Sequence, residues 1–119
     1  MKTIGVIGSR RRNSEDDYHI VEAAFFRAYK QGDRICSGGC PKGGDRFAEM
    51  IAKKFDIPIL IYKAEWELFG RGAGFIRNTD IAQSSNILIA CVAEDRKGGT
   101  EDTIRKFLQI QPATNLILV

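Results

Sequence analysis

The regular alternation of two apolar patterns constrains the fold of this chain more than any other feature. Five short segments are rich in isoleucine and valine and nearly free of charge, which is typical of strands buried on both faces of a sheet. They span residues 2–8, 34–37, 58–62, 86–93 and 115–119. Between them, apolar residues recur every three or four positions, which predicts amphipathic helices over residues 14–30, 45–55, 74–84 and 100–109.

Strands and helices that alternate in this way predict a parallel sheet, because each crossover helix must pack back onto the sheet. We therefore expect an α/β fold, a Rossmann-like three-layer α/β/α sandwich with about five mostly parallel strands. The chain has no linker, internal repeat or low-complexity tract, and its 119 residues suffice for one domain. A single domain over residues 1–119 is predicted.

The composition argues against several classes of protein. The formal net charge is only +3, well below the basic excess of a dedicated nucleic-acid binder. Three cysteines and the single His19 include no C-x-x-C pair, so we expect neither disulfides nor a metal site. Cys36 and Cys91 are predicted core thiols, and Cys40 an exposed one. Without a membrane-length apolar run or a signal-peptide cleavage site, the sequence predicts a cytoplasmic protein with no membrane contact.

Polar and glycine-rich loops follow three of the predicted strands. They are residues 8–13 (GSRRRN), 37–45 (SGGCPKGGD) and 96–100 (RKGGT). In parallel sheets, ligands bind beyond the carboxyl ends of the strands, near the point where the strand order reverses. We therefore expect the three loops to form one site.

The loop over residues 37–45 contains four glycines. Glycine lets backbone N–H groups converge on one point, and the following helix presents its positive end, so a phosphate is the expected ligand. Lys42, Arg46 and the arginines at 10–12 add positive charge. The ligand-binding residues predicted on this side are Gly8, Ser9, Arg10, Ser37, Gly38, Gly39, Lys42, Gly43, Gly44 and Asp45.

Two common nucleotide-binding motifs are missing. A P-loop needs lysine and a hydroxyl residue after its second glycine, whereas Gly43 is followed by Gly44 and Asp45. The first loop also lacks the G-x-G-x-x-G dinucleotide fingerprint. Neither an ATPase nor an ordinary NAD dehydrogenase is supported, and no cofactor is predicted. Asp45 has a second interpretation, as the N-cap of its own helix, and the sequence leaves both open.

The third loop has a different charge pattern. Gly98, Gly99 and Thr100 resemble another anion cradle, but Glu101 and Asp102 follow them and would repel a phosphate. We therefore expect the ligand phosphate over residues 38–44 and the arginine loop, and its sugar toward Thr100 and Glu101. The alternative, that both acids merely complement the helix dipole, stays open.

The remaining unusual segment is residues 64–78 (AEWELFGRGAGFIRN). Its alternating glycines at 70–74 predict a mobile loop. Trp66 can stack on a base, or it can pack into the core or a subunit contact. Arg77 and Asn78 are predicted to lie early in the next helix, beside the same pocket.

These residues together resemble the YspA-type branch of the SLOG superfamily over essentially the whole chain. The motifs that carry the resemblance are Gly8-Ser9-Arg10, Ser37-Gly38-Gly39 with Gly43-Gly44-Asp45, Trp66 with Gly70, Ala73-Gly74 and Arg77-Asn78, and Gly98-Gly99-Thr100. The resemblance implies a Rossmann-like fold and a nucleotide or nucleotide-like ligand at these positions.

The superfamily also contains the Lonely Guy phosphoribohydrolases and the DNA-processing protein A domain. Arg77 matches an arginine of the former, but Thr103 stands where their P-G-G-x-G-T-x-x-E motif has its glutamate. A hydroxyl cannot replace that carboxylate, whose role is worth about 10²-fold or more. Glu101 faces about 160° away from position 103 on a helix. If the chain is an enzyme, Arg77 and either Glu101 or Asp45 are its candidate catalytic residues.

The leading hypothesis is a binding module: a cytoplasmic homo-oligomer, a dimer, that captures a nucleotide or nucleotide-derived phosphate as a sensor or binding protein. The first alternative is a nucleoside-monophosphate phosphoribohydrolase that cleaves the N-glycosidic bond. The second is single-stranded DNA binding by residues 10–12, Lys42 and Arg46. The modest net charge and the lack of an interleaved aromatic platform argue against a nucleic-acid partner.

Overall fold

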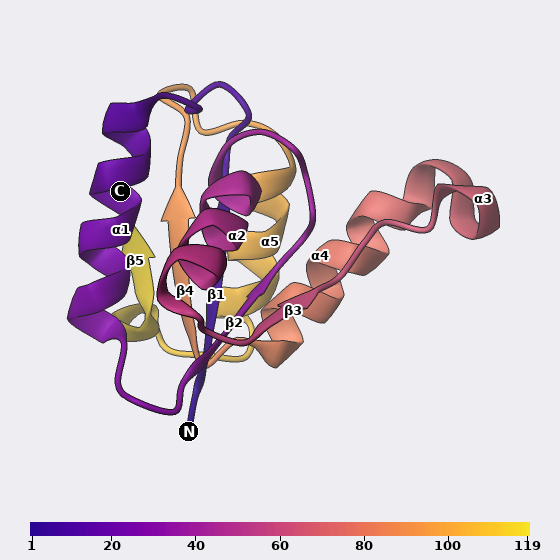
Figure 1. The fold of residues 1–119 in the computed structure, drawn as a ribbon. Helices are drawn as coiled ribbons and strands as arrows, with labels where there is room; N and C mark the ends of the chain where they lie inside the picture. The colour runs from indigo at the N-terminus through magenta and orange to yellow at the C-terminus, as the bar shows by residue number, and fades with distance from the viewer.

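The computed structural model describes residues 1–119, in which strands and helices alternate as the sequence predicts (Figure 1). The strands are β1 (Thr3–Gly8), β2 (Arg34–Ser37), β3 (Ile59–Ile61), β4 (Ile87–Cys91) and β5 (Leu116–Leu118). The α-helices are α1 (Glu15–Ala28), α2 (Gly44–Phe55), α3 (Trp66–Phe69), α4 (Ala73–Ser84) and α5 (Gly99–Leu108), and two short 3-10 turns are η1 (Gly70–Gly72) and η2 (Ala113–Asn115).

All five strands belong to one parallel sheet, in the order β3-β2-β1-β4-β5. Ile4 of β1 pairs with Ile35 of β2 on one side and with Ile87 of β4 on the other. The strand β1 is therefore central; β2 and β3 are added on one side of it, and β4 and β5 on the other side. The strand order reverses between β1 and β4, where parallel sheets form ligand-binding crevices.

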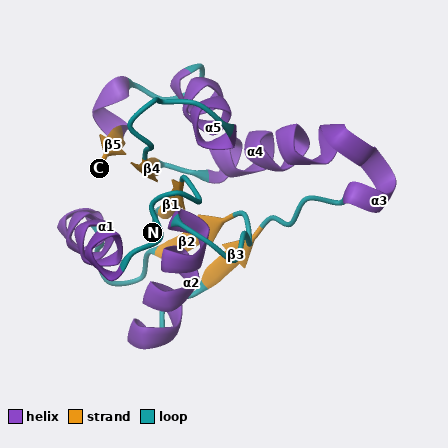
Figure 2. Ribbon diagram, turned by 90° about the horizontal axis from the view of Figure 1, so that it is seen from above, coloured by secondary structure: helices purple, strands orange, loops and turns teal.

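Helices cover both faces of the sheet, which confirms the predicted three-layer α/β/α sandwich (Figure 2). Alternate residues of β1 point to opposite faces. Val6 packs in the larger core with α1 and α2, around Phe25 and Phe47. Ile7 packs in the smaller core with α4 and α5, which includes Phe107. Both faces of β1, β2 and β4 are thus buried, as predicted, whereas the edge strands β3 and β5 are partly exposed.

The first helix begins as its sequence indicates. The Ser14 hydroxyl accepts a hydrogen bond from the Asp17 N–H at 3.0 Å, and the Asp17 side chain reaches back to the Ser14 backbone, which completes a capping box. None of the helices combines the length and the apolar character needed to cross a lipid bilayer.

The prediction of a mobile loop at the alternating glycines is wrong. Residues 66–72 form α3 and η1, and α4 begins directly after them at Ala73. Gly70 adopts a φ of 55°, which ends α3 and lets the chain bend into the next helical turn. The result is a helical projection that extends away from the sheet (Figure 1), where the sequence pattern indicated only irregular backbone.

Candidate ligand-binding site

A cavity of about 450 Å³ lies at the carboxyl edge of the sheet, where the strand order reverses. It falls in the size range of small-molecule sites. Most of the side chains that line it are polar. The lining residues are Ile7, Gly8, Ser9, Arg10, Arg11, Cys40, Asp45, Arg77, Asn78, Ile81, Lys97, Gly98, Gly99, Thr100 and Thr103.

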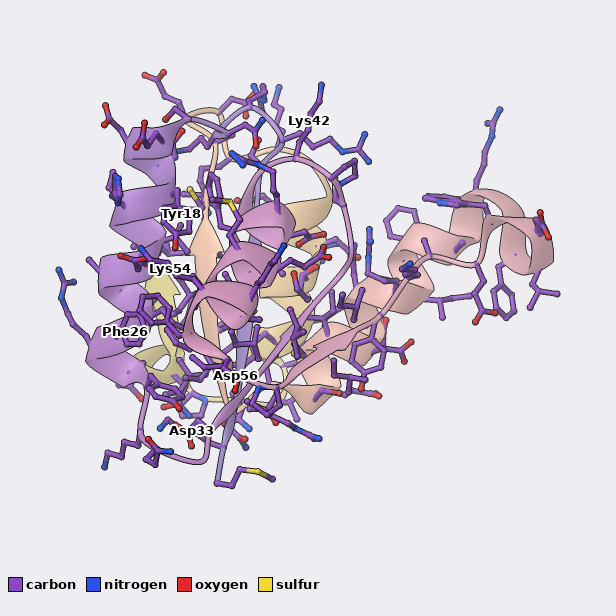
Figure 3. The ribbon with its side chains drawn as sticks, viewed as in Figure 1. Tyr18, Phe26, Asp33, Lys42, Lys54 and Asp56 are labelled. Atoms are coloured by element: carbon purple, nitrogen blue, oxygen red, sulfur yellow. The ribbon has the colours of Figure 1, made fainter.

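The structure divides the predicted site residues into two groups. Those that line the cavity are Gly8, Ser9, Arg10, Asp45, Arg77, Asn78, Gly98, Gly99 and Thr100. Those that do not are Ser37, Gly38, Gly39, Lys42, Gly43, Gly44 and Glu101. The loops after β1 and β4 therefore converge as expected, whereas most of the glycine-rich loop after β2 lies outside the cavity. Lys42 is exposed at the end of that loop (Figure 3).

Two glycines of this loop serve close packing between main chains. A Cβ on Gly43, whose φ is 74°, would lie 2.3 Å from the Ser9 carbonyl oxygen. A Cβ on Gly44 would lie 2.1 Å from the carbonyl carbon of Ile7. The Gly43 N–H is also occupied, since it donates to the Asn13 side-chain oxygen at 2.8 Å. These positions need glycine so that α2 can begin directly against β1, which accounts for them without a phosphate.

Asp45 does not cap its helix. Gly43 is the N-cap of α2, and no side chain caps that end. Instead, the buried Asp45 carboxylate accepts hydrogen bonds from the Ser37 hydroxyl at 2.9 Å and from the Cys40 N–H at 3.1 Å. Burial raises the pKa of Asp45 above its ordinary value, against the lowering effect of these hydrogen bonds. The helix-cap interpretation is therefore wrong, and Asp45 is the only carboxylate residue in the cavity lining.

A chain of hydrogen bonds fixes the orientation of Arg77 and Asn78. The Arg77 guanidinium donates to the Gly38 carbonyl oxygen at 3.0 Å and to the Asn78 side-chain oxygen at 2.9 Å. The Asn78 amide nitrogen then donates to Asp102 at 3.1 Å and to the Gly99 carbonyl at 3.3 Å. Since every polar atom of the Asn78 side chain has a partner, its direction in the cavity wall is set.

Asp102 supports the cavity wall, a role that was not predicted from the sequence. It lies in the first turn of α5, where an acid is expected to complement the helix dipole. In the structure it is buried and also forms ion pairs with Arg105 at 2.6 Å and Lys106 at 2.9 Å. Burial acts to raise the pKa of Asp102, but hydrogen bonds from Lys106 and Asn78 outweigh it and hold that pKa below its ordinary value. The basic residues three and four positions later were the available signal.

Of the three arginines after β1, only Arg10 remains available to a ligand. Arg11 forms a two-point ion pair with Asp95 at 2.6 and 2.9 Å. Arg12 pairs with an acid of α1 and donates to two backbone carbonyls. Arg10 and Lys97, which follows β4, line the cavity and form no ion pair within the chain. Neither of these two positive charges has a counter-ion within the chain.

The N-terminus of α5 lies beside these cations. Gly98 is its N-cap, no side chain caps the first turn, and Gly98, Gly99 and Thr100 all line the cavity. The first N–H groups of a helix have no intrahelical acceptor. Glu101 does not face the cavity, because it forms a two-point ion pair with Arg96 at 2.8 and 2.9 Å. The expectation that Glu101 would meet the sugar of a ligand is thus not met.

The hydroxyl at position 103 was also missed as a wall residue. Thr103 is buried, lines the cavity, and donates to the Gly99 carbonyl at 3.2 Å. No cluster of three or more histidine, cysteine or acidic side chains is placed to hold a metal ion. The arrangement offers N–H donors, guanidinium and ammonium groups, and one buried carboxyl, a set suited to an anionic ligand that also carries hydroxyls.

The chain was compared with known protein families, with curated proteins and with solved structures, and none of the three comparisons found a match.

Proposed function

We propose that the protein binds a nucleotide or nucleotide-derived phosphate as a sensor or binding protein. One observation carries this proposal: Arg10 and Lys97, two cations that form no ion pair within the chain, line the same cavity as the uncapped N-terminus of α5. Helix N-termini with adjacent cations are recurrent phosphate sites. The cavity of about 450 Å³ has room for a sugar and a base beyond the phosphate.

The proposed orientation is opposite to that predicted from the sequence. The phosphate lies against the N–H groups of residues 98–100, between Arg10 and Lys97. The sugar hydroxyls lie toward Asp45, whose carboxyl accepts hydrogen bonds and would repel a phosphate, with Arg77 beside it. Two findings support the reversal: the glycines before α2 are occupied in packing against β1, and Glu101 is held by Arg96 outside the cavity lining.

We also propose that the chain is a member of the SLOG superfamily, in its YspA-type branch, and that it acts in the cytoplasm as a homodimer. This assignment rests on the four motifs in order along the sequence. The fold supports this assignment because three of the motifs line one cavity: Gly8-Ser9-Arg10, Arg77-Asn78 and Gly98-Gly99-Thr100.

A thermal-shift and calorimetric panel tests the binding proposal. Nucleoside monophosphates and diphosphates should raise the melting temperature, and the corresponding nucleosides should raise it much less. Arg10→Ala and Lys97→Ala should each weaken nucleotide binding by about ten-fold or more, the usual effect of losing one charge-assisted hydrogen bond. Arg27→Ala and Lys30→Ala, at exposed cations that do not line the cavity, are the matched controls. Equal shifts by nucleosides and nucleotides would refute the phosphate site.

One observation supports the alternative function of a phosphoribohydrolase: the buried carboxyl of Asp45 lies in the cavity wall, which also includes Arg77. Its raised pKa suits a group that must deliver a proton to a leaving base. Incubating the protein with AMP and other monophosphates, followed by chromatography, would detect free base. Release that Asp45→Asn abolishes and Arg27→Ala preserves would support this activity; no release at high protein concentration would remove it.

Single-stranded DNA binding is not favoured by any contact. Of the cations proposed for it, Arg11 and Arg12 are paired internally, and Arg46 donates to the Asn13 side chain and backbone.

A further inference from the structure

A helical arm extends from the molecule, and we define it as residues 65–76, comprising α3, η1 and the first turn of α4. Figures 1 and 2 show it reaching away from the sheet and from the other helices. The contacts of α3 are chiefly with η1 and α4. Trp66 lies against Gly74 within the arm, where an added Cβ would be 3.4 Å from its ring. The outer part of the arm is therefore folded only on itself.

Five large apolar side chains of the arm face solvent. The exposed fractions are 57% for Trp66, 73% for Leu68, 50% for Phe69, 59% for Phe75 and 43% for Ile76. Taking about 200 Å² for each full side chain, these fractions leave about 550 Å² of apolar surface exposed. This total is comparable in area with the largest apolar patch on an ordinary monomer, about 300–600 Å², and it comes from one short segment of the chain.

The exposed area matches the requirement of a dimer. Homodimer interfaces are about 65% apolar, so about 550 Å² of apolar surface corresponds to about 850 Å² buried by each partner. A stable interface of standard size buries about 800 Å² per partner. The apolar area of one arm is therefore of the order that a homodimer interface requires.

The charges of the arm favour a second copy over a lipid surface. Glu65, Glu67 and Arg71 are exposed and form no ion pair within the chain. Anionic lipid surfaces attract clusters of lysine and arginine, whereas this arm carries more acid than base. In a two-fold contact the same patch meets itself, so Arg71 of one copy can pair with Glu67 of the other.

We propose that the helical arm is the contact through which two copies of this chain form a homodimer. The contact also bears on the cavity, because α4 continues from Ile76 in the arm directly to Arg77 in the cavity wall. Dimerisation would therefore hold the outer end of a helix whose next residues line the cavity. The proposal does not depend on the identity of the ligand, since its observations all lie on the arm.

The mass of the protein in solution, measured by light scattering and sedimentation equilibrium without ligand, tests the proposal. The wild type should have twice the chain mass of 13.3 kDa. The double variant Leu68→Glu with Phe69→Glu should raise the dimer dissociation constant by about a hundred-fold or more, since each substitution occurs twice in a two-fold interface. Leu108→Glu with Ile110→Glu, at apolar residues 42% and 55% exposed on the body, is the matched control and should remain dimeric.

A charge-reversal pair adds a readout that a folding defect cannot mimic. Arg71→Glu should weaken the dimer, and adding Glu67→Arg should restore it, because the double variant recreates opposite charges across the two-fold axis. Circular dichroism should match the wild type for every variant, since the substituted side chains are exposed, and any fall in melting temperature should follow the loss of the dimer. A monomeric wild type up to its solubility limit, or a dimer that survives Leu68→Glu with Phe69→Glu, would overturn the proposal.

Discussion

Replacing Gly44 with alanine should destabilise the protein severely, although alanine is the smallest possible side chain for this position. Gly44 is the first residue of α2, and an added methyl group would lie 2.1 Å from the Ile7 carbonyl carbon and 2.2 Å from the Gly8 nitrogen. Carbon atoms in contact normally lie about 3.5–4.0 Å apart. The overlap is thus more than about 1 Å, and the atoms on the other side belong to the backbone of β1, so no side chain can rotate away.

The size of the effect follows from what must move. Overpacking in a core costs about 1–3 kcal/mol when side chains can adjust; here α2 must lift from β1, so we expect about 3 kcal/mol or more. At about 4 °C per kcal/mol for a domain of this size, the melting temperature should fall by about 12 °C. Thermal unfolding followed by circular dichroism measures this directly.

Gly72→Ala is the control. Gly72 has an ordinary negative φ of −75° and no atom near its missing Cβ, so alanine should stabilise the protein by about 0.4–1 kcal/mol. If Gly44→Ala unfolds within about 2 °C of the wild type, the reasoning that this glycine permits helix-to-strand contact is refuted. The glycine-rich loop would then not be required for packing of α2 against β1.

Three further predictions concern carboxylates. Burial acts to raise the pKa of Asp33, but hydrogen bonds from Lys2 and Lys30 outweigh it and lower that pKa to about 2. The contribution of Asp33 to stability is therefore present above about pH 4 and is lost as the pH falls toward 2. Urea unfolding of Asp33→Asn, measured as a function of pH, should not show that loss. Asp45 has its pKa raised by burial, so its contribution to stability falls as pH rises through that pKa. Asp45→Asn should lack this pH dependence in urea unfolding and should bind nucleotide more weakly by calorimetry. Glu101→Gln should leave nucleotide affinity unchanged, because that carboxylate pairs with Arg96 outside the cavity; a ten-fold loss would return Glu101 to the site.

The strand pattern was readable from the sequence because strands buried on both faces tolerate almost no charge. The second strand was predicted over residues 34–37 and forms over the same residues. The fourth was predicted over residues 86–93 and ends at Cys91, since hydrophobic residues beyond it continue into the loop. Parallel order followed from the alternation with helices, and the strand order that places the crevice became visible only in the fold.

The helical arm was not readable because its apolar residues are not buried. Periodicity indicates a helix when one face must pack, and Leu68 and Phe75 pack on no core. Alternating glycines there were interpreted as a loop, yet one positive φ at Gly70 is enough to join two helical turns. An exposed apolar segment gives the same local pattern whether it is irregular or helical.

The sequence predicted many of the residues that line the cavity, but not what their side chains contact. A glycine at the start of a helix can allow the close approach either of a ligand or of another segment of main chain. Only the short distance from Gly44 to Ile7 distinguishes these two explanations. Likewise, the sequence shows that Glu101 and Asp102 follow a glycine pair, but the partners Arg96 and Asn78 come from tertiary contacts. Those partners turn one acid outward and make the other a support for the cavity wall.

The position of phosphorus in a crystal soaked with a nucleoside monophosphate tests the central claim most directly. We predict phosphate oxygens at about 3 Å from the backbone N–H groups at the start of α5, with Arg10 and Lys97 in contact and the sugar toward Asp45. A phosphate bound over residues 38–44 instead, or no nucleotide in the cavity at saturating concentration, would contradict it.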